Sequence, residues 1–290
     1  MICPRREKSL FELHFAVAIM STAGIFAKLI ILPARDIIAL RCLVATVALV
    51  AFTRFSRTPL RIASWRDRAW IALIGLIVTV HWVAYFTSVK FSTVTIALVA
   101  VYTYPVITAL LEPLFSREPL DRHGLRMALI VFGGVYLAVP GGFQGGQYAL
   151  GAGLGVLSAV LYSFRNLIYR RFLAHLPPST VMTYQVAIPA LLLSPSLLSQ
   201  GIDVTVEYRW LYLLLLGVVV TALAHTLYSS SLRTIKASTA GMISSLEPIY
   251  GMALAAILLS EMPAGQTVAG TLIVVAVAVY MSLRVNRDTG

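Results

Sequence analysis

The sequence predicts an all-α integral membrane protein of ten transmembrane helices, arranged as two inverted five-helix repeats. Composition is the first observation behind this prediction: 59% of the 290 residues are hydrophobic, 12% are charged, and the mean hydropathy is +0.85. A soluble domain carries about twice that share of charged residues. The chain therefore has too little polar surface to face water on all sides and belongs in a lipid bilayer.

An internal repeat is the second observation. Residues 85–120 and 228–263 align at a constant offset of 143. The aligned pairs include Tyr85 with Tyr228, Ser88 with Ser231, Ala97 with Ala240, Pro105 with Pro248, and Glu118 with Glu261. A repeat of this kind inside a membrane protein is typical of folds built from two related halves.

Ten apolar stretches are long enough to cross a bilayer, which takes about 20 residues of helix. They are 11–32, 36–54, 69–88, 92–114 and 123–140 in the first repeat (11–140), and 148–169, 178–199, 209–231, 237–260 and 263–283 in the second repeat (148–283). An outer connector, 141–147, joins the repeats. Because each repeat has an odd number of spans, the second enters the membrane in the opposite orientation.

The basic residues predict the orientation. With the N-terminus in the cytoplasm, seventeen of the 23 Lys and Arg residues fall at cytoplasmic ends of spans, three at outer ends and three within spans. This asymmetry follows the positive-inside rule. It predicts a multi-pass protein of the plasma membrane, a bacterial inner membrane, with both termini cytoplasmic. The same distribution accounts for the net charge of +11, so no nucleic-acid partner is expected.

Three local features are assigned to ordinary roles. The GGFQGG connector lacks the Lys-Ser/Thr ending of a phosphate-binding loop, so we expect a flexible link. The basic start of the chain precedes a full-length span without a clear cleavage site, which predicts a retained first helix. Cys3 and Cys42 are expected on opposite sides of the membrane and therefore unpaired.

Two prolines are candidate gating residues. Pro105 and Pro248 stand near the centres of the fourth and ninth spans, at matched repeat positions. A proline lacks the amide hydrogen and clashes with the preceding turn, so the helix bends or loosens there. The alternative is a static packing kink.

Charged residues within spans are costly unless they are paired, neutralised or hydrated. Glu247, about ten residues into the ninth span, is expected to contact a substrate ammonium group or a proton, or else to make a helix-packing hydrogen bond. Lys28 and Arg165 are expected to snorkel to water, and Arg41 to pair with Asp36 or snorkel outward. Glu118 and Glu261 end their spans, which predicts caps or gate contacts.

Aromatic and polar side chains recur at spacings of three or four, which places them on common helix faces. The candidate substrate-binding residues are His81, Trp82, Tyr85, Tyr102, Tyr104, Tyr162, His225, Tyr228, Ser244, Glu247 and Tyr250. Buried packing or an interfacial position is the alternative for the Tyr and His residues. His81 and His225 lack a Cys or carboxylate cluster at ligand spacing, so we expect neither a metal nor another cofactor.

These features together resemble the drug/metabolite transporter superfamily, EamA type, from about Leu13 to Leu283. The second repeat is the closer match, with Ser-Leu-Glu-Pro at 245–248 and Leu-Ser-Glu at 259–261; the first departs in having Tyr104 where Glu247 stands. Arg41 fits a basic position often seen in the family's second span, and Gln185 is its repeat partner. The resemblance implies a central cavity lined by spans one, three, four, six, eight and nine.

The resemblance also implies transport rather than catalysis. The expected cavity combines Tyr, Trp and His with few charges, which favours the amino acid exporter branch. We therefore predict export of aromatic and other neutral amino acids by alternating access, without obligatory ion coupling. The alternative is proton-coupled transport of nucleosides, nucleotide sugars or other metabolites. An intramembrane enzyme is disfavoured because the chain has no GxSxG or HExxH motif. The expected partners are a small-molecule substrate and the bilayer; the oligomeric state stays open, and a monomer is compatible with the repeat.

Overall fold

The computed structural model describes residues 4–116, 122–142, 146–200, 207–231 and 243–288. Glu118, Ala240 and Cys3, to which the sequence assigned roles, lie outside these ranges. All regular secondary structure in the described ranges is helical. The first half comprises α1 (Pro4–Met20), α2 (Ala23–Leu29), α3 (Ala34–Phe55), α4 (Trp65–Phe91), α5 (Val94–Val101), α6 (Tyr104–Ser116) and α7 (Arg122–Ala138).

The second half contains the equivalent spans and two π-helical segments. It comprises α8 (Gly146–Ile168), η1 (Tyr169–Leu173), α9 (Pro178–Gln200), α10 (Glu207–Leu214), η2 (Leu215–Leu223), α11 (Ala224–Ser231), α13 (Glu247–Leu259) and α14 (Gly265–Asp288). The π-helical segments η1 and η2 have a wider turn than the α-helices that flank them. They were not foreseen, because hydropathy does not distinguish the two kinds of turn.

The helices suit a membrane in length and in surface chemistry. Among the described residues, seven helical segments are long and apolar enough to cross a bilayer. Three shorter apolar helices, His123–Ala138, Glu247–Leu259 and Gly265–Met281, coincide with the three remaining predicted spans. Large apolar side chains such as Leu129, Leu191 and Ile257 stand exposed on the outside of the bundle. Lipid tails solvate such side chains without cost. The predicted ten-helix membrane fold is therefore confirmed.

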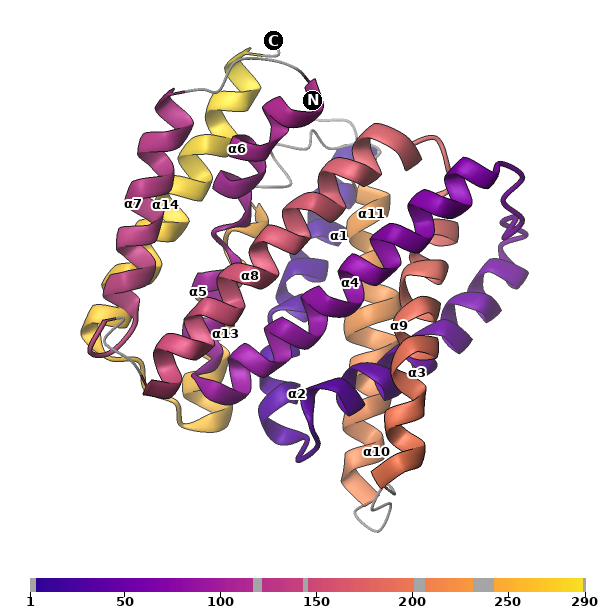
Figure 1. Cartoon of the computed structure of the whole chain (residues 1–290), viewed down its shortest axis with the longest axis horizontal. Helices are drawn as coiled ribbons and strands as arrows, with labels where there is room; N and C mark the ends of the chain where they lie inside the picture. Colours follow the sequence, from indigo (N-terminus) through magenta and orange to yellow (C-terminus); the bar gives the residue numbers. More distant parts are fainter. Residues whose placement is uncertain (1–3, 117–121, 143–145, 201–206, 232–242, 289–290) are drawn as a thin grey trace.

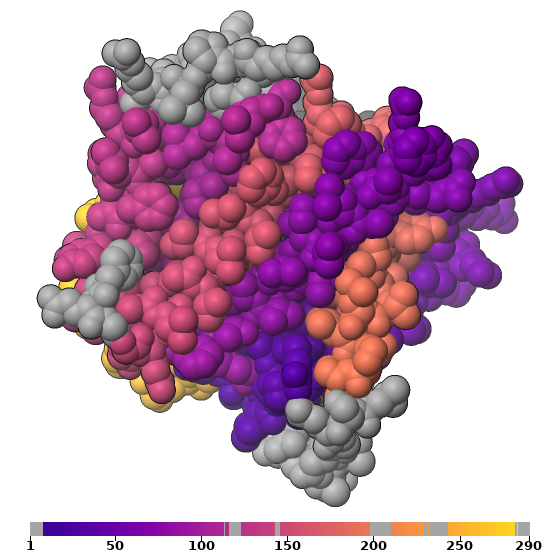
Figure 2. Space-filling model, in the orientation of Figure 1, coloured from indigo at the N-terminus to yellow at the C-terminus, as the bar shows by residue number. Residues whose placement is uncertain are grey.

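Helices from the two halves pack on one another in matched pairs. The second span of each half contacts the other (α3 with α9), and so does the fifth (α7 with α14). The third span of one half contacts the first span of the other, as α4 with α8 and α1 with α11. The chain ends marked N and C lie at the same end of the bundle (Figure 1). On the face in Figure 2, the side chains of α4, α8 and α9 pack side by side.

Two spans that were predicted as single helices are interrupted at matched positions. Turns at 102–103 and 245–246, again 143 residues apart, precede α6 and α13. Pro105 and Pro248 are therefore not in mid-helix: each is the second residue of a new helix, where a missing amide hydrogen costs little. The first span is also broken, between α1 and α2.

The α7–α14 pair depends on two glycines that let the helix backbones touch. A Cβ added at Gly270 would lie 2.4 Å from the Gly134 carbonyl oxygen and 2.6 Å from the Ala138 nitrogen. Gly133, one residue earlier on α7, has nothing within 4 Å of the same added atom.

We expect Gly270→Ala to destabilise the protein by about 1–3 kcal/mol, because neither backbone can yield to the methyl group. Gly133→Ala is the matched control and should be neutral or slightly stabilising, since alanine loses less entropy in a helix. Thermal unfolding of the purified protein in detergent measures both. Equal melting temperatures for the two variants would contradict the close packing.

Candidate functional site

A cavity of about 750 Å³ lies between the two halves. Its lining runs from the middle of the bundle to the connection between η1 and α9, where Arg170, Ala174 and His175 are exposed. The cavity therefore reaches the surface at the end of the bundle that holds both termini (Figure 1). Its walls come from both halves, which is the arrangement that alternating exposure of one site requires.

Most of the candidate residues face this cavity. Ten of the eleven candidate substrate-binding residues line it, and so does Pro105. Tyr250 does not: its ring packs on a separate apolar cluster of Leu13, Val17 and Ile243. Pro248 is buried outside the lining as well. Its position at the start of α13 places Glu247, rather than the proline, on the cavity wall.

A row of rings forms one wall of the cavity. The His81 ring stacks on Tyr162 at 5.0 Å, Tyr162 meets Tyr104 edge-on at 4.9 Å, and Tyr104 meets Tyr102 at 5.5 Å. These residues come from α4, α8 and the α5–α6 break. Offset and edge-on ring pairs are mutually attractive. Their faces form an apolar, polarisable wall bordered by hydroxyl groups, which is suited to a ring-bearing ligand.

The row of rings ends at Glu247. The Tyr102 hydroxyl donates a hydrogen bond to Glu247 Oε2. Glu247 is the first residue of α13, so its carboxyl group also lies at a helix N-terminus, where the helix dipole favours negative charge. It is 7% exposed and is the only carboxylate among the described lining residues. The helix breaks in the two halves thus meet at this hydrogen bond.

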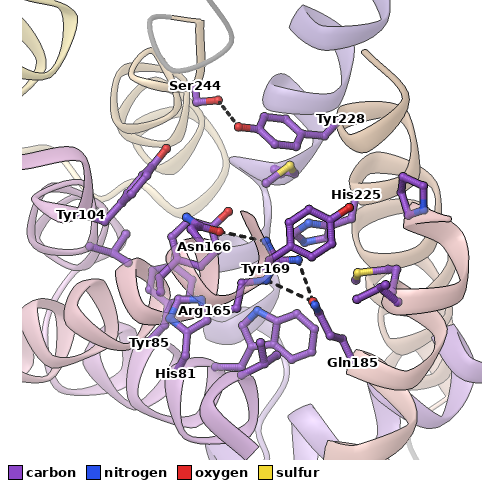
Figure 3. A pocket seen from close by; sticks show the side chains of 18 of the residues that line it. His81, Tyr85, Tyr104, Arg165, Asn166, Tyr169, Gln185, His225, Tyr228 and Ser244 are labelled. Atoms are coloured by element: carbon purple, nitrogen blue, oxygen red, sulfur yellow. Dashed lines mark hydrogen bonds between the residues drawn. The ribbon is translucent and has the colours of Figure 1, made fainter. Parts of the chain in front are cut away.

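Hydrogen bonds fix side chains on both sides of the cavity. His81 Nδ1 lies 2.9 Å from the Ser158 carbonyl oxygen and 2.7 Å from the Ser158 hydroxyl oxygen. The Ser158 hydroxyl also donates to the His81 carbonyl oxygen at 3.1 Å. Across the cavity, the Ser244 hydroxyl donates to the Tyr228 hydroxyl at 3.5 Å (Figure 3). Within the described ranges, no three His, Cys, Asp or Glu side chains cluster as metal ligands would.

Beyond the cavity lining, at the end of the bundle opposite the opening, four residues from both halves meet in what is here named the closing contact: Lys28, Ser92, Val94 and Glu261. Lys28 Nζ donates to the Ser92 carbonyl oxygen at 2.6 Å and lies 3.5 Å from Glu261 Oε1. The Val94 amide donates to Glu261 Oε2 at 3.0 Å. Glu261 therefore caps α5, as expected for an acid at a span end, and Lys28 is held there rather than extending into water.

Comparison with known proteins identifies the family. Residues 10–139 and 149–283 match the EamA-like transporter family. The chain belongs to this family. It is accordingly a multi-pass membrane transporter.

Several relatives carry the same general description. The chain is 25% identical over 264 residues to the uncharacterized transporter YxxF of Bacillus subtilis, covering 86% of this chain and 81% of that protein. It is 26% identical to an uncharacterized transporter of Archaeoglobus fulgidus (69% of this chain, 70% of the relative) and to one of Synechocystis (78% and 70%). A crystal structure with 20% sequence identity has the same fold, with a TM-score of 0.70 over 98% of this chain and 99% of the other.

Sequence reasoning missed the basic residues of this transporter's cavity. Arg165 was expected to snorkel to water. It is partly exposed on the cavity wall, and its guanidinium donates to Gln185 Oε1 at 2.7 and 3.2 Å and to Asn166 Oδ1 at 2.9 Å (Figure 3). Arg41 neither pairs with Asp36 nor snorkels. It is 2% exposed and lies 4.4 Å above the Trp82 ring.

Spans two and seven thus line the cavity through Arg41 and Gln185, beyond the six spans that the resemblance implied. The signal was present in the sequence. Arginine is rare inside a membrane span and usually faces the interior of the bundle or a water-filled cavity.

Because the Tyr102–Glu247 hydrogen bond joins the two helix breaks, we expect substitutions of these two residues to be energetically coupled. Tyr102→Phe should cost about 1–3 kcal/mol of stability, because a buried carboxyl group loses its donor. When Glu247→Gln is already present, Tyr102→Phe should cost less, with a coupling energy of about 0.5–3 kcal/mol.

Unfolding of the single and double variants in detergent measures this coupling. The control is Tyr148→Phe, a half-exposed tyrosine at the start of α8, which should leave stability unchanged. Strict additivity of Tyr102→Phe and Glu247→Gln would show that the hydrogen bond does not join the breaks.

Proposed function

We propose that this transporter exports aromatic and other neutral amino acids by alternating access. The observation that carries the proposal is the position of Glu247 at the end of the row of rings. An aromatic amino acid joins an ammonium group to a ring. Its ammonium group would meet the Glu247 carboxylate, and its ring would pack on Tyr104 and Tyr162.

The proposed orientation decides from which side the substrate enters the cavity in this conformation. Basic residues gather at the end that holds the termini, and we place that end in the cytoplasm on the positive-inside rule. The cavity then faces the cytoplasm, and the closing contact seals the outer side. Export requires this contact to separate while the cytoplasmic mouth closes. The breaks at 102–103 and 245–246 are the places where the helices can bend most easily.

We further infer that transport needs no ion gradient. Proton-coupled transporters use carboxylates that bind and release a proton in step with the binding and release of the substrate. Among the described lining residues, the cavity offers one carboxylate, Glu247, which already accepts from Tyr102. At the equivalent position of the first half stands Tyr104. The substrate's own gradient is therefore the proposed driving force.

Liposomes that contain the purified protein, with no ion gradient, should equilibrate labelled phenylalanine down its own gradient. Glu247→Gln should slow this flux, because the ammonium group loses its counter-charge, whereas Tyr250→Phe, outside the cavity, should not. The initial rate of tracer uptake is the measurement. Uptake that depends on an imposed pH gradient would overturn the uncoupled mechanism. Uptake of nucleosides or nucleotide sugars, with none of amino acids, would overturn the substrate class.

The closing contact predicts how access is controlled. In a Cys3→Ser, Cys42→Ala background, Ala23→Cys places a thiol on the cavity lining, beyond the contact. A membrane-impermeant maleimide added outside intact cells should label it slowly. Glu261→Gln should speed this labelling several-fold, because the Lys28 and Val94 interactions weaken together.

The matched control for the closing contact is Glu112→Gln. It makes the same change at the opposite end of the bundle, where Glu112 pairs with Arg170. This variant should leave outside labelling unchanged or reduce it. If Glu261→Gln and Glu112→Gln had the same effect, the closing contact would not control outer access.

A further inference from the structure

Besides Glu247, the cavity lining contains the buried cation Arg41 and the partly exposed cation Arg165. Arg41 on α3 is 2% exposed, and its guanidinium carbon lies 4.4 Å from the centre of the Trp82 ring and 5.1 Å from that of Phe86. Its Nε is buried without a hydrogen-bond partner. Within the described ranges Arg41 forms no ion pair. The acid nearest to it in sequence, Asp36, is bound by Arg35 and Ser196 instead.

Gln185 presents an unused donor to the same cavity. It lies on α9, which packs against α3, and is 2% exposed. Both hydrogen bonds from Arg165 go to Gln185 Oε1, and these fix which way the amide points. Its Nε2 is left buried and without a partner. Figure 3 shows Gln185 and Arg165 joined at the cavity wall.

The two arginines act on the same part of the cavity. Both Arg41 and Arg165 line this cavity, as do His81 and His225. Trp82, which lies beneath Arg41, has its ring 6.3 Å from that of His225. Arg165 is bonded to Gln185, and the Gln185 helix, α9, packs against α3, which carries Arg41, so the three residues belong to one side of the lining.

This region has a physical requirement that the protein itself does not meet. A buried donor without a partner is destabilising, and a buried cation without a counter-charge is more so. Arg165 is partly satisfied by neutral amide oxygens, whereas Arg41 lies against two ring faces and keeps Nε without a partner. The one carboxylate of the described lining is held by Tyr102. An anionic group from outside the protein would satisfy both needs.

We propose that Arg41, Gln185 and Arg165 form a subsite for the carboxylate of the transported molecule. A guanidinium group and a primary amide present planar sets of N–H donors, which match the two coplanar oxygens of a carboxylate. This inference rests on the proposed function in one respect: a zwitterionic amino acid would place its carboxylate here and its ammonium group at Glu247. The subsite itself requires only a carboxylate.

The test compares ligands that differ in one group. Phenylalanine, its amide, 3-phenylpropanoate and 2-phenylethylphosphonate are titrated into the purified transporter in detergent, and binding is measured by calorimetry. We expect phenylalanine to bind at least about tenfold more tightly than its amide, and 3-phenylpropanoate to bind in the absence of any ammonium group. Arg41→Gln should abolish this acid-over-amide preference while leaving the affinity for the amide nearly unchanged.

A second variant guards against misfolding of Arg41→Gln. Gln185→Glu is nearly isosteric and keeps an oxygen acceptor for Arg165, so it should fold; it replaces the Nε2 donor by a negatively charged acceptor and should also remove the preference for the acid. The controls are Arg35→Gln and Gln266→Glu, which make the same changes outside the cavity lining and should retain the preference.

The outcomes separate the subsite from the proposed function. Binding of 3-phenylpropanoate that is lost in both variants supports the subsite, even if liposomes transport no amino acid. Equal affinity for phenylalanine and its amide, or a preference unchanged in Gln185→Glu, overturns the subsite even if amino acids are transported. Tighter binding of the phosphonate than of either carboxylate overturns the assignment to a carboxylate.

Discussion

Two interrupted helices, one from each half, meet at the hydrogen bond between Tyr102 and Glu247, and both interruptions place residues on the cavity wall. Each interruption ends a helix in the middle of the protein and starts another one whose first residues face inward. In an uninterrupted helix, successive residues would point in all directions around the helix axis. The break instead places Tyr104 and Glu247 on the wall, and the α13 N-terminus favours the carboxylate. The proline that follows each of them suits the first turn of the new helix.

Three of the four buried side-chain atoms without a hydrogen-bond partner in the described interior belong to residues that line the cavity: Arg41, Thr108 and Gln185. Hydroxyl groups elsewhere in the helices mostly donate to carbonyl oxygens within their own helix, as Thr79 does to Gly75 and Thr271 to Thr267. Arg41 Nε and Gln185 Nε2 have no such neighbour. A membrane protein tolerates polar groups of this kind where water or a ligand can reach them. Stability is thus given up in the region where binding is proposed.

The spans, the repeat and most of the aromatic lining could be predicted because they depend on hydropathy and on spacings of three or four residues. The basic lining could not be placed in this way. Arg165 and Gln185 belong to different helices, and the Val94–Glu261 contact joins residues 167 positions apart. Hydropathy indicated that the charged ends of Arg165 and Lys28 avoid the hydrocarbon region of the bilayer. It did not indicate whether they are hydrated or bound by another residue. The helix breaks were expected only as bends, because a proline indicates where a helix is disturbed but not whether it bends or is interrupted completely.

The α7–α14 pair has a mechanical consequence. Neither helix lines the cavity among the described residues, yet each belongs to a different half and they touch backbone to backbone at Gly134 and Gly270. Side chains of ordinary size let packed helices slide, because rotamers can readjust between them. Bare backbones have no such compliant layer. A shift of one helix along the other would therefore press backbone against backbone, so this pair is the part of the interface between the halves that we expect to keep its register when the halves rock.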